Sequence, residues 1–121
     1  ETGGFQGDGK SCTIISFEDD AFLQRIQQQP NLWKPFPPDE TVKTLLYGVY
    51  TDKYAISPSV TGKDSPEEPL IPPIEKGYYL LEDRHSEAKE NLDLLDRSSY
   101  NFTLSVYDTD NRTLYYYKLD T

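Results

Sequence analysis

Short apolar stretches, bounded by polar or turn-forming residues, predict the strands of this chain. Four of them are rich in β-branched or aromatic residues and lie at 12–17, 77–81, 100–107 and 113–119. The last two alternate apolar with polar residues and are joined by a polar segment, 108–112, which predicts a β-hairpin. A longer run, 41–56, is interrupted at Gly48 and at 51–53, and it predicts either one bent strand or a tight hairpin.

Two other stretches have the spacing of amphipathic helices. The first follows a capping-box-like pair, Ser16 and Asp19, and ends before Pro30. Its apolar face consists of Phe22, Leu23 and Ile26. The second extends from about His85 to Arg97, because apolar residues recur there at i, i+4 and i+7. These residues are Ala88, Leu92 and Leu95.

The predicted order is strand, helix, strand, strand, helix, strand, strand. This is the element order of an α+β domain with a split βαβ (ferredoxin-like) sheet, to which the C-terminal hairpin adds a strand and in which two helices cover one face. A mostly β sandwich is the alternative, in which the first helix is only a turn. The length fits a single domain, expected over 11–121. Residues 1–10 are expected to be a glycine-rich flexible leader, and Glu1-Thr2-Gly3 resembles the remnant of a secretion vector.

Two proline-rich segments predict loops. Segment 30–38 contains four prolines around two large rings, Trp33 and Phe36, and a stiff loop presents such rings at low entropic cost. Trp33 and Phe36 are therefore the predicted partner-binding residues; in the alternative, both rings cap the edge of the core. Segment 57–77, with five prolines, predicts a long surface loop.

Composition indicates a folded chain, and the net charge disfavours one class of partner. The chain is 36% hydrophobic and 13% aromatic, which is rich enough for a folded core. Its formal net charge of -9 repels phosphate backbones and anionic lipids, so nucleic acid is not expected as a partner. No apolar stretch approaches the length that spans a bilayer, and these residues are expected to be soluble. A membrane tether outside them stays open.

Two Asn-x-Ser/Thr sequons, at Asn101 and Asn111, lie on the predicted C-terminal hairpin. Together with the secretion-type start, they predict N-glycosylation at both asparagines and an extracellular or cell-surface location.

Cys12 is the only cysteine, so these residues cannot form a disulfide among themselves. Three states of the thiol stay open. It is a buried free thiol at the start of a strand, it is bonded to a second copy in a covalent dimer, or it is bonded to a cysteine outside this sequence.

Two formal motifs have simpler explanations. Residues 4–11 match the phosphate-binding loop pattern, but a working loop follows a strand and opens a helix, whereas here a strand is predicted next. Residues 108–111 offer alternating oxygen ligands for calcium, but Arg112 stands where an EF-hand ligand belongs and Asp and Asn are ordinary turn residues. No cofactor and no metal is expected.

Catalysis is not expected either. The single histidine, His85, and the single cysteine cannot supply the ligands of a zinc site, and a serine triad would depend on His85 at the start of a predicted helix. The expected function is non-catalytic: extracellular protein-protein recognition or adhesion, with another protein as the partner. Two alternatives remain, a structural spacer module of a larger ectodomain and a small carboxylate-dependent hydrolase.

Overall fold

The computed structural model describes residues 2–7, 9–61, 69–83 and 101–120. Contacts divide the chain into two compact units, one made of 1–37 with 74–121 and the other of 38–73. The second predicted helix, 85–97, and His85 lie outside the described residues. The prediction that 11–121 forms one extracellular domain stays a prediction.

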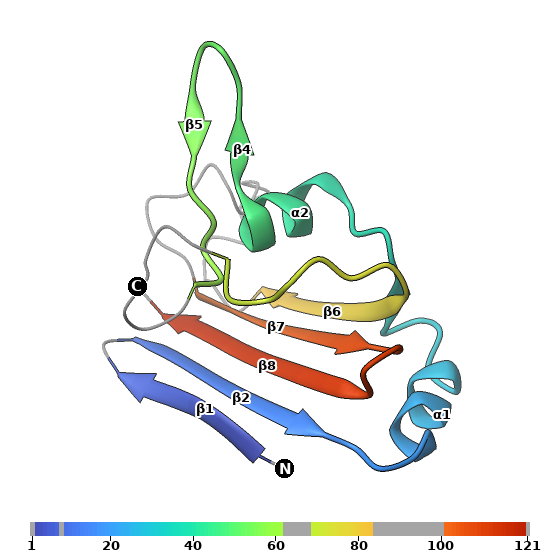
Figure 1. Cartoon of the computed structure of the whole chain (residues 1–121). Coiled ribbons are helices and arrows are strands. Elements are labelled where there is room, and N and C mark those ends of the chain that lie inside the picture. The colour runs from blue at the N-terminus through green and yellow to red at the C-terminus, as the bar shows by residue number, and fades with distance from the viewer. Residues whose placement is uncertain (1, 8, 62–68, 84–100, 121) are drawn as a thin grey trace. The chain divides into compact units, whose positions relative to one another are not determined.

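The first unit contains a six-stranded antiparallel sheet in the order β1-β2-β8-β7-β6-β3 (Figure 1). Its strands are β1 (Thr2–Gly7), β2 (Lys10–Ser16), β3 (Lys34–Pro35), β6 (Gly77–Asp83), β7 (Asn101–Asp108) and β8 (Thr113–Asp120). Helix α1 (Ala21–Gln27) lies near the end of the sheet where β2 ends and β8 begins. The predicted α+β class, the first helix and the β7–β8 hairpin are confirmed.

The strand order differs from the predicted split βαβ sheet, in which a parallel pair of strands flanks a crossover. Here β2 pairs antiparallel with β8, and β6, β7 and β8 follow one another in a meander. Hydrophobic alternation locates strands along the chain, but it does not say which strand edges pair. Of the two predicted helices, α1 is the first, and the second, 85–97, lies outside the described residues.

Both faces of the central strand β7 are buried. One face carries Phe102, Leu104 and Val106, all fully buried, as their alternation predicts. The opposite face carries Thr103, Ser105 and Tyr107, which are also buried at 5%, 7% and 0% exposure, although alternation of polar with apolar residues favours an exposed face. Tyr107 forms a cluster with Ile26 of α1 and Leu114 of β8, so the helix covers this end of the sheet.

The predicted flexible leader is also wrong for most of its length. Residues 2–7 form β1, whose backbone pairs with β2 from Lys10 to Ile15. Gly9, directly before β2, has a φ of 82°, a conformation that glycine adopts without steric cost. Glycine-rich sequence forms an edge strand here because pairing uses the backbone and needs no side chain.

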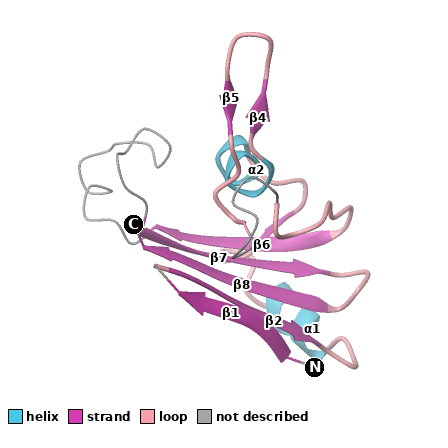
Figure 2. Ribbon diagram, turned by 60° about the vertical axis from the view of Figure 1, so that its left-hand side comes forward, coloured by secondary structure: helices cyan, strands magenta, loops and turns pink. Residues whose placement is uncertain are grey.

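The second unit contains helix α2 (Glu40–Tyr47) and the two-stranded sheet of β4 (Val49–Tyr50) and β5 (Ala55–Ile56), shown in Figure 2. A strand was predicted from Thr41 onward, which is wrong up to Tyr47; the alternative of a tight hairpin is confirmed for 49–56. The helix begins at Asp39, whose Oδ1 accepts a hydrogen bond from the backbone N–H of Val42 at 2.9 Å.

The same apolar residues that suggested a strand also have helical spacing. Val42, Leu45 and Leu46 lie at i, i+3 and i+4, and all three are fully buried. With an Asp cap in front, this spacing favours the helix over a strand.

The predicted surface loop, 57–77, is partly buried. Val60 and Ile71 are fully buried, and the backbone N–H of Val60 donates to the carbonyl of Leu45 at 2.9 Å. Tyr47 Oη donates to the carbonyl of Pro72 at 3.2 Å. These hydrogen bonds connect the described parts of the segment, before and after 62–68, to α2. Val60 and Ile71, which lie between the prolines, add buried apolar contacts.

Candidate recognition surfaces

Residues 49–56, which we call the β4–β5 arm, form a short hairpin that extends from the end of α2 (Figure 1). Val49 pairs with Ile56 and Tyr50 with Ala55. At the tip, the backbone N–H of Thr51 donates to the carbonyl of Tyr54 at 2.9 Å. The turn is thus closed by its own backbone.

Side-chain bonds reinforce the tip. Thr51 Oγ1 accepts from the backbone N–H of Tyr54 at 3.1 Å and from that of Lys53 at 3.3 Å. Hydroxyl-to-backbone bonds of this type are a common means of holding a tight turn. Asp52 and Lys53 bring one negative and one positive charge to the tip, so the arm has no net charge.

Gly48 connects α2 to the arm in a conformation that other residues rarely adopt. Its φ is 75°, and a Cβ at this position would lie 2.3 Å from the carbonyl oxygen of Ile56. Its N–H donates to the carbonyl of Thr44 at 2.8 Å and ends the helix. The direction in which the arm leaves the helix therefore depends on glycine.

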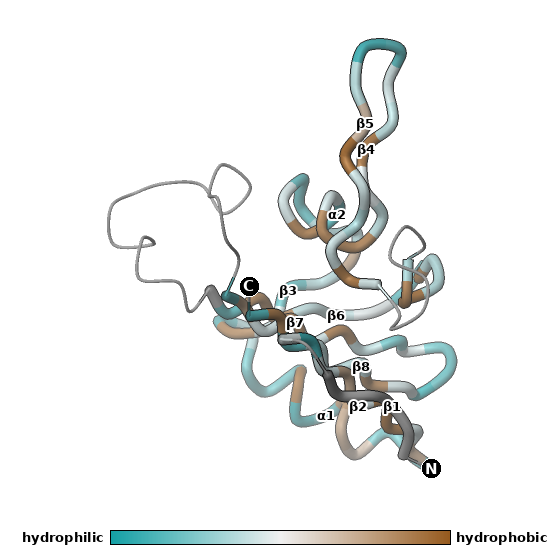
Figure 3. Tube along the Cα trace, turned by 90° about the vertical axis from the view of Figure 1, so that its left-hand side faces the viewer, coloured by the Kyte–Doolittle hydropathy of each residue, from teal (hydrophilic) through white to brown (hydrophobic). Residues whose placement is uncertain are grey.

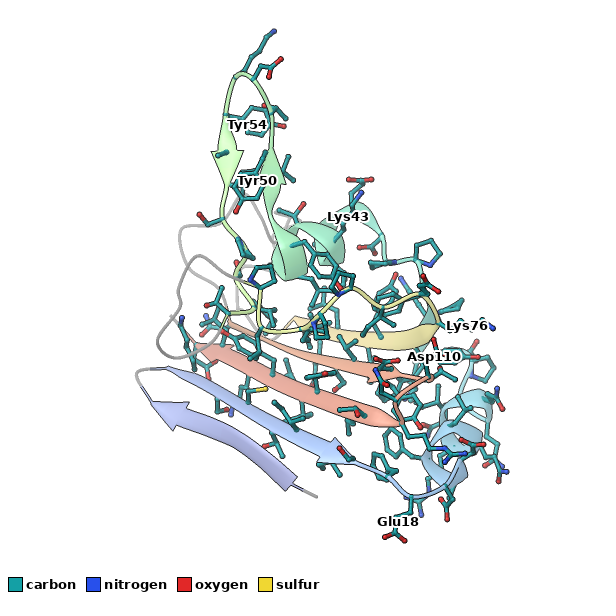
Figure 4. All side chains as sticks on the ribbon, in the orientation of Figure 1. Glu18, Lys43, Tyr50, Tyr54, Lys76 and Asp110 are labelled. Atoms are coloured by element: carbon teal, nitrogen blue, oxygen red, sulfur yellow. The ribbon has the colours of Figure 1, made fainter. Side chains whose placement is uncertain are left out.

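The arm carries most of the large apolar side chains that are exposed in the described part of the chain. Tyr50 is 64% exposed, Tyr54 55% and Ile56 41%, and only Leu32 and Tyr116 join them. Figure 4 shows both tyrosines projecting from the hairpin, and Figure 3 shows that the apolar base of the arm gives way to a polar tip. Apolar side chains gathered on one exposed element are a recurrent feature of protein-binding sites.

A second candidate surface belongs to the first unit. The α1 groove is a hollow of about 410 Å³ beside helix α1. Its lining consists of Phe22, Arg25, Ile26, Gln28, Gln29 and Trp33. Its volume lies at the lower end of the range for small-ligand sites. Phe22 and Trp33 meet edge to face, with ring centroids 6.1 Å apart, so the apolar wall is preformed.

A smaller hollow of about 230 Å³ lies along the same helix and shares two residues, Phe22 and Arg25, with the α1 groove. Phe17 and Ala21 complete its lining. Phe17 stacks on Phe22 with centroids 4.9 Å apart, and both rings pack against the buried ring of Tyr107. Phe22, which lines both hollows, therefore belongs to the aromatic cluster that packs α1 against the sheet.

An ion pair fixes the loop before α1. Arg112, in the β7–β8 turn, donates from Nε to Asp20 Oδ1 at 2.9 Å and from Nη1 to the carbonyl of Glu18 at 3.2 Å. Its carbonyl in turn accepts from the N–H of Phe17 at 2.8 Å. The start of α1 is therefore held against the end of the β7–β8 hairpin.

The structure does not bring the two predicted partner-binding residues together. Trp33 packs on the cluster of α1 and lines the α1 groove. Phe36 contacts Tyr79, with centroids 5.8 Å apart, whereas the neighbouring Tyr78 packs with Trp33's cluster. Successive residues of β6 face opposite sides of the sheet, so Trp33 and Phe36 lie on opposite faces of its β3 edge. Both rings are half-buried, and their role in binding stays a prediction.

The two sequons occupy different environments. Asn111 is exposed in the β7–β8 turn, and its Nδ2 donates to Asp108 Oδ2 at 2.8 Å. A glycosylated amide keeps one N–H, so this bond is compatible with a glycan. Asn101 is the first residue of β7 and is half-buried.

The segment considered for calcium forms an ordinary turn. Asp108 is 4% exposed, and its Oδ1 accepts from the backbone N–H of Asp110 at 3.1 Å and of Asn111 at 3.4 Å. Its carboxylate therefore closes the turn, which accounts for the acidic residue by local hydrogen bonding.

Residues 4–11 do not have the geometry of a phosphate-binding loop. Gly4 pairs with Thr13 and Gln6 with Ser11 in the β1–β2 hairpin. Residues 4–7 and 10–11 of the pattern thus lie in two antiparallel strands, whereas a phosphate-binding loop presents its N–H groups at the start of a helix.

Cys12 is a free thiol in β2 and is 3% exposed. Its position opposite Tyr117 places it on the same buried face as Leu104. Burial raises the pKa of the thiol to about 11, so little reactive thiolate forms near neutral pH. Of the three states left open by the sequence, the buried thiol fits this geometry best; the covalent dimer stays a prediction.

The comparisons with known proteins give no family. No protein-family model, no curated protein and no solved structure matches the chain. Over the ranges that the structure describes, no helix is long and apolar enough to cross a membrane, and no three His, Cys, Asp or Glu side chains gather in a metal-binding arrangement.

The arm was not among the sites expected from the sequence. Two signals in the sequence point to it. Gly48 separates a cappable helix from the next apolar residues, and 51–53 is a polar turn only three residues long. Strands this short do not join a larger sheet, so their tyrosine side chains have no neighbouring element to pack against.

Proposed function

We propose that this chain is an extracellular, glycosylated, non-catalytic domain that recognises another protein. The observation that carries the proposal is the β4–β5 arm, with Tyr50, Tyr54 and Ile56 exposed on one hairpin. Tyrosine is enriched in binding hot spots because it provides a large, stiff, amphipathic contact surface.

A partner protein with a concave apolar groove suits the arm better than a second copy of this chain. Eight residues bury too little surface against an identical hairpin, since stable interfaces bury roughly 800 Å² per partner. Each copy also carries a net charge of -9, so two copies repel one another. Insertion into a groove covers both faces of the arm at once.

The extracellular location rests on the two sequons. Asn111 is exposed in a tight turn, where it is accessible to modification. We expect protein secreted from animal cells to lose mass in two steps on enzymatic deglycosylation, one for Asn111 and one for Asn101. Complete resistance to deglycosylation would remove the support for this location.

The recognition role is tested with the secreted, glycosylated chain on an array of secreted proteins and cell-surface ectodomains. We expect at least one of them to retain the wild-type chain, and we expect the double variant Tyr50→Ser/Tyr54→Ser to lose that binding. The matched control is Tyr116→Ser, which removes an exposed tyrosine from β8 instead. An array that retains nothing, or one that retains all three proteins equally, would contradict the proposal.

A further inference from the structure

The α1 groove combines an apolar wall with a positively charged side chain, that of Arg25, which has no ion-pair or hydrogen-bond partner among the described residues. Arg25 lines both the groove and the smaller hollow beside it. Its guanidinium forms neither an ion pair nor a hydrogen bond with any described residue, in contrast to Arg112, which is paired with Asp20. The groove therefore presents one unneutralised positive charge next to Phe22 and Trp33.

Two of the three acidic side chains before α1, those of Asp19 and Asp20, are engaged elsewhere. Asp20 accepts from Arg112, and Asp19 Oδ1 accepts from the backbone N–H of Ala21 at 3.0 Å. Arg25 lies in the last turn of the helix, where the helix dipole favours a cation. The dipole explains why arginine is tolerated at this position. It provides neither a ligand for the groove nor an ion-pair or hydrogen-bond partner for the guanidinium.

We propose that the α1 groove and the adjacent hollow bind an acidic segment of a partner protein, in which a Glu or Asp lies between apolar side chains. The carboxylate pairs with Arg25, which stands between the two hollows and donates charge-assisted hydrogen bonds. One apolar side chain enters the groove beside Trp33, and another enters the hollow beside Phe17. This inference rests on the proposed function, because a protein partner has to supply the segment.

The chain's net charge of -9 does not exclude an acidic ligand. At physiological ionic strength, exposed charges more than about 8 Å apart are largely screened. A carboxylate in contact with Arg25 is attracted at hydrogen-bond distance, whereas most of the repelling charges act through solvent. A single acidic residue flanked by apolar side chains is therefore favoured over a highly acidic segment or a nucleic acid.

Trp33 provides a direct readout, because it is the only tryptophan in the chain. Its indole N–H resonance and its fluorescence report on the α1 groove without interference from another tryptophan. The probe is the peptide acetyl-Leu-Glu-Leu-amide, titrated into the full chain to millimolar concentration. We expect a saturable shift of the indole resonance, and about tenfold weaker binding of acetyl-Leu-Gln-Leu-amide, which lacks the charge.

The matched pair of variants is Arg25→Gln and Lys34→Gln. Both residues are exposed cations of the same unit, but Lys34 does not line the groove. We expect Arg25→Gln to weaken binding of the Glu peptide about tenfold and to abolish its preference over the Gln peptide, while Lys34→Gln leaves both unchanged. Thermal unfolding of each variant verifies that the fold is retained.

The inference is overturned if the Glu peptide gives no saturable response, if both peptides bind equally, or if Arg25→Gln binds like the wild type. Its failure is distinguishable from failure of the proposed function. If the array retains the chain through the arm while the peptide does not bind, only the groove is excluded. If the peptide binds as expected and the array retains nothing, the groove stands and recognition through the arm fails.

Discussion

Strand β7 and the β4–β5 arm are built from similar residues in opposite environments. Both combine valine, threonine and tyrosine, yet Val106 and Tyr107 are fully buried whereas Tyr50 is 64% exposed. β7 is paired along both edges and covered on both faces, but the strands of the arm pair only with one another. Apolar side chains therefore stabilise the fold in β7, while in the arm they remain available to a partner.

The comparison is tested most strongly by removing one ring from each region. We expect Phe102→Ala to lower the free energy of unfolding by about 3 to 5 kcal/mol, because it leaves a cavity at a fully buried position. We expect Tyr54→Ala to change it by less than about 0.5 kcal/mol, because that ring is mostly exposed. Urea unfolding measures both. Equal losses would show that the arm belongs to the core.

Cys12 tests the burial of the sheet through pH. The folded state raises the pKa of the thiol from 9.0 to about 11, so between these values it retains a proton that the unfolded chain releases. The free energy of unfolding should therefore fall by about 2 to 3 kcal/mol as the pH rises from 9.0 to about 11. We expect Cys12→Ala to remove this part of the pH dependence. An identical slope in both proteins would mean that the thiol is accessible.

Replacing Asp39 tests the stability of α2, the helix from which the arm extends. We expect Asp39→Ala to destabilise the chain by about 1 kcal/mol, because the N–H of Val42 loses its capping partner. Asp52→Ala, at the exposed tip, is the control and should have a smaller effect. Hydrogen exchange of α2 amides follows the change locally. Unaltered exchange in α2 would contradict the capping role.

Tyr107 is expected to show the smallest effect, despite its complete burial. Its hydroxyl has no hydrogen-bond partner in the part of the chain that the structure describes, and burial raises its pKa. Tyr107→Phe should leave the stability unchanged or raise it by up to about 1 kcal/mol, since it removes an unsatisfied polar group. A clear loss of stability on urea unfolding would reveal a partner for the hydroxyl.

Strands β7 and β8 were predictable because apolar residues alternate with polar ones along them. Phe102, Leu104 and Val106 follow period two without interruption, and their burial agrees with that pattern. Helix α1 was predictable for the same reason, from the helical spacing of Phe22 and Ile26. Local patterns of this kind report which face of an element is buried.

Other features were not predictable, because the local pattern of apolar and polar residues does not determine them. Val42, Leu45 and Leu46 fit either a strand or a helix, and the cap at Asp39 decides in favour of the helix. Trp33 and Phe36 are close in the sequence, but β3 passes between them and separates their rings onto opposite faces. The candidate arm was missed because exposure depends on what packs against a hairpin, which the hairpin's own sequence does not specify.

The most direct test of recognition by the arm is the dissociation constant of the captured ectodomain for four proteins: wild type, Tyr50→Ser, Tyr54→Ser and Tyr116→Ser. We expect each arm variant to bind about 30-fold more weakly, the loss typical of a hot-spot tyrosine, while Tyr116→Ser stays within about twofold of the wild type. All four should unfold at similar temperatures. If Tyr116→Ser weakens binding as much as the arm variants do, or if the arm variants bind like the wild type, the arm is not the recognition site.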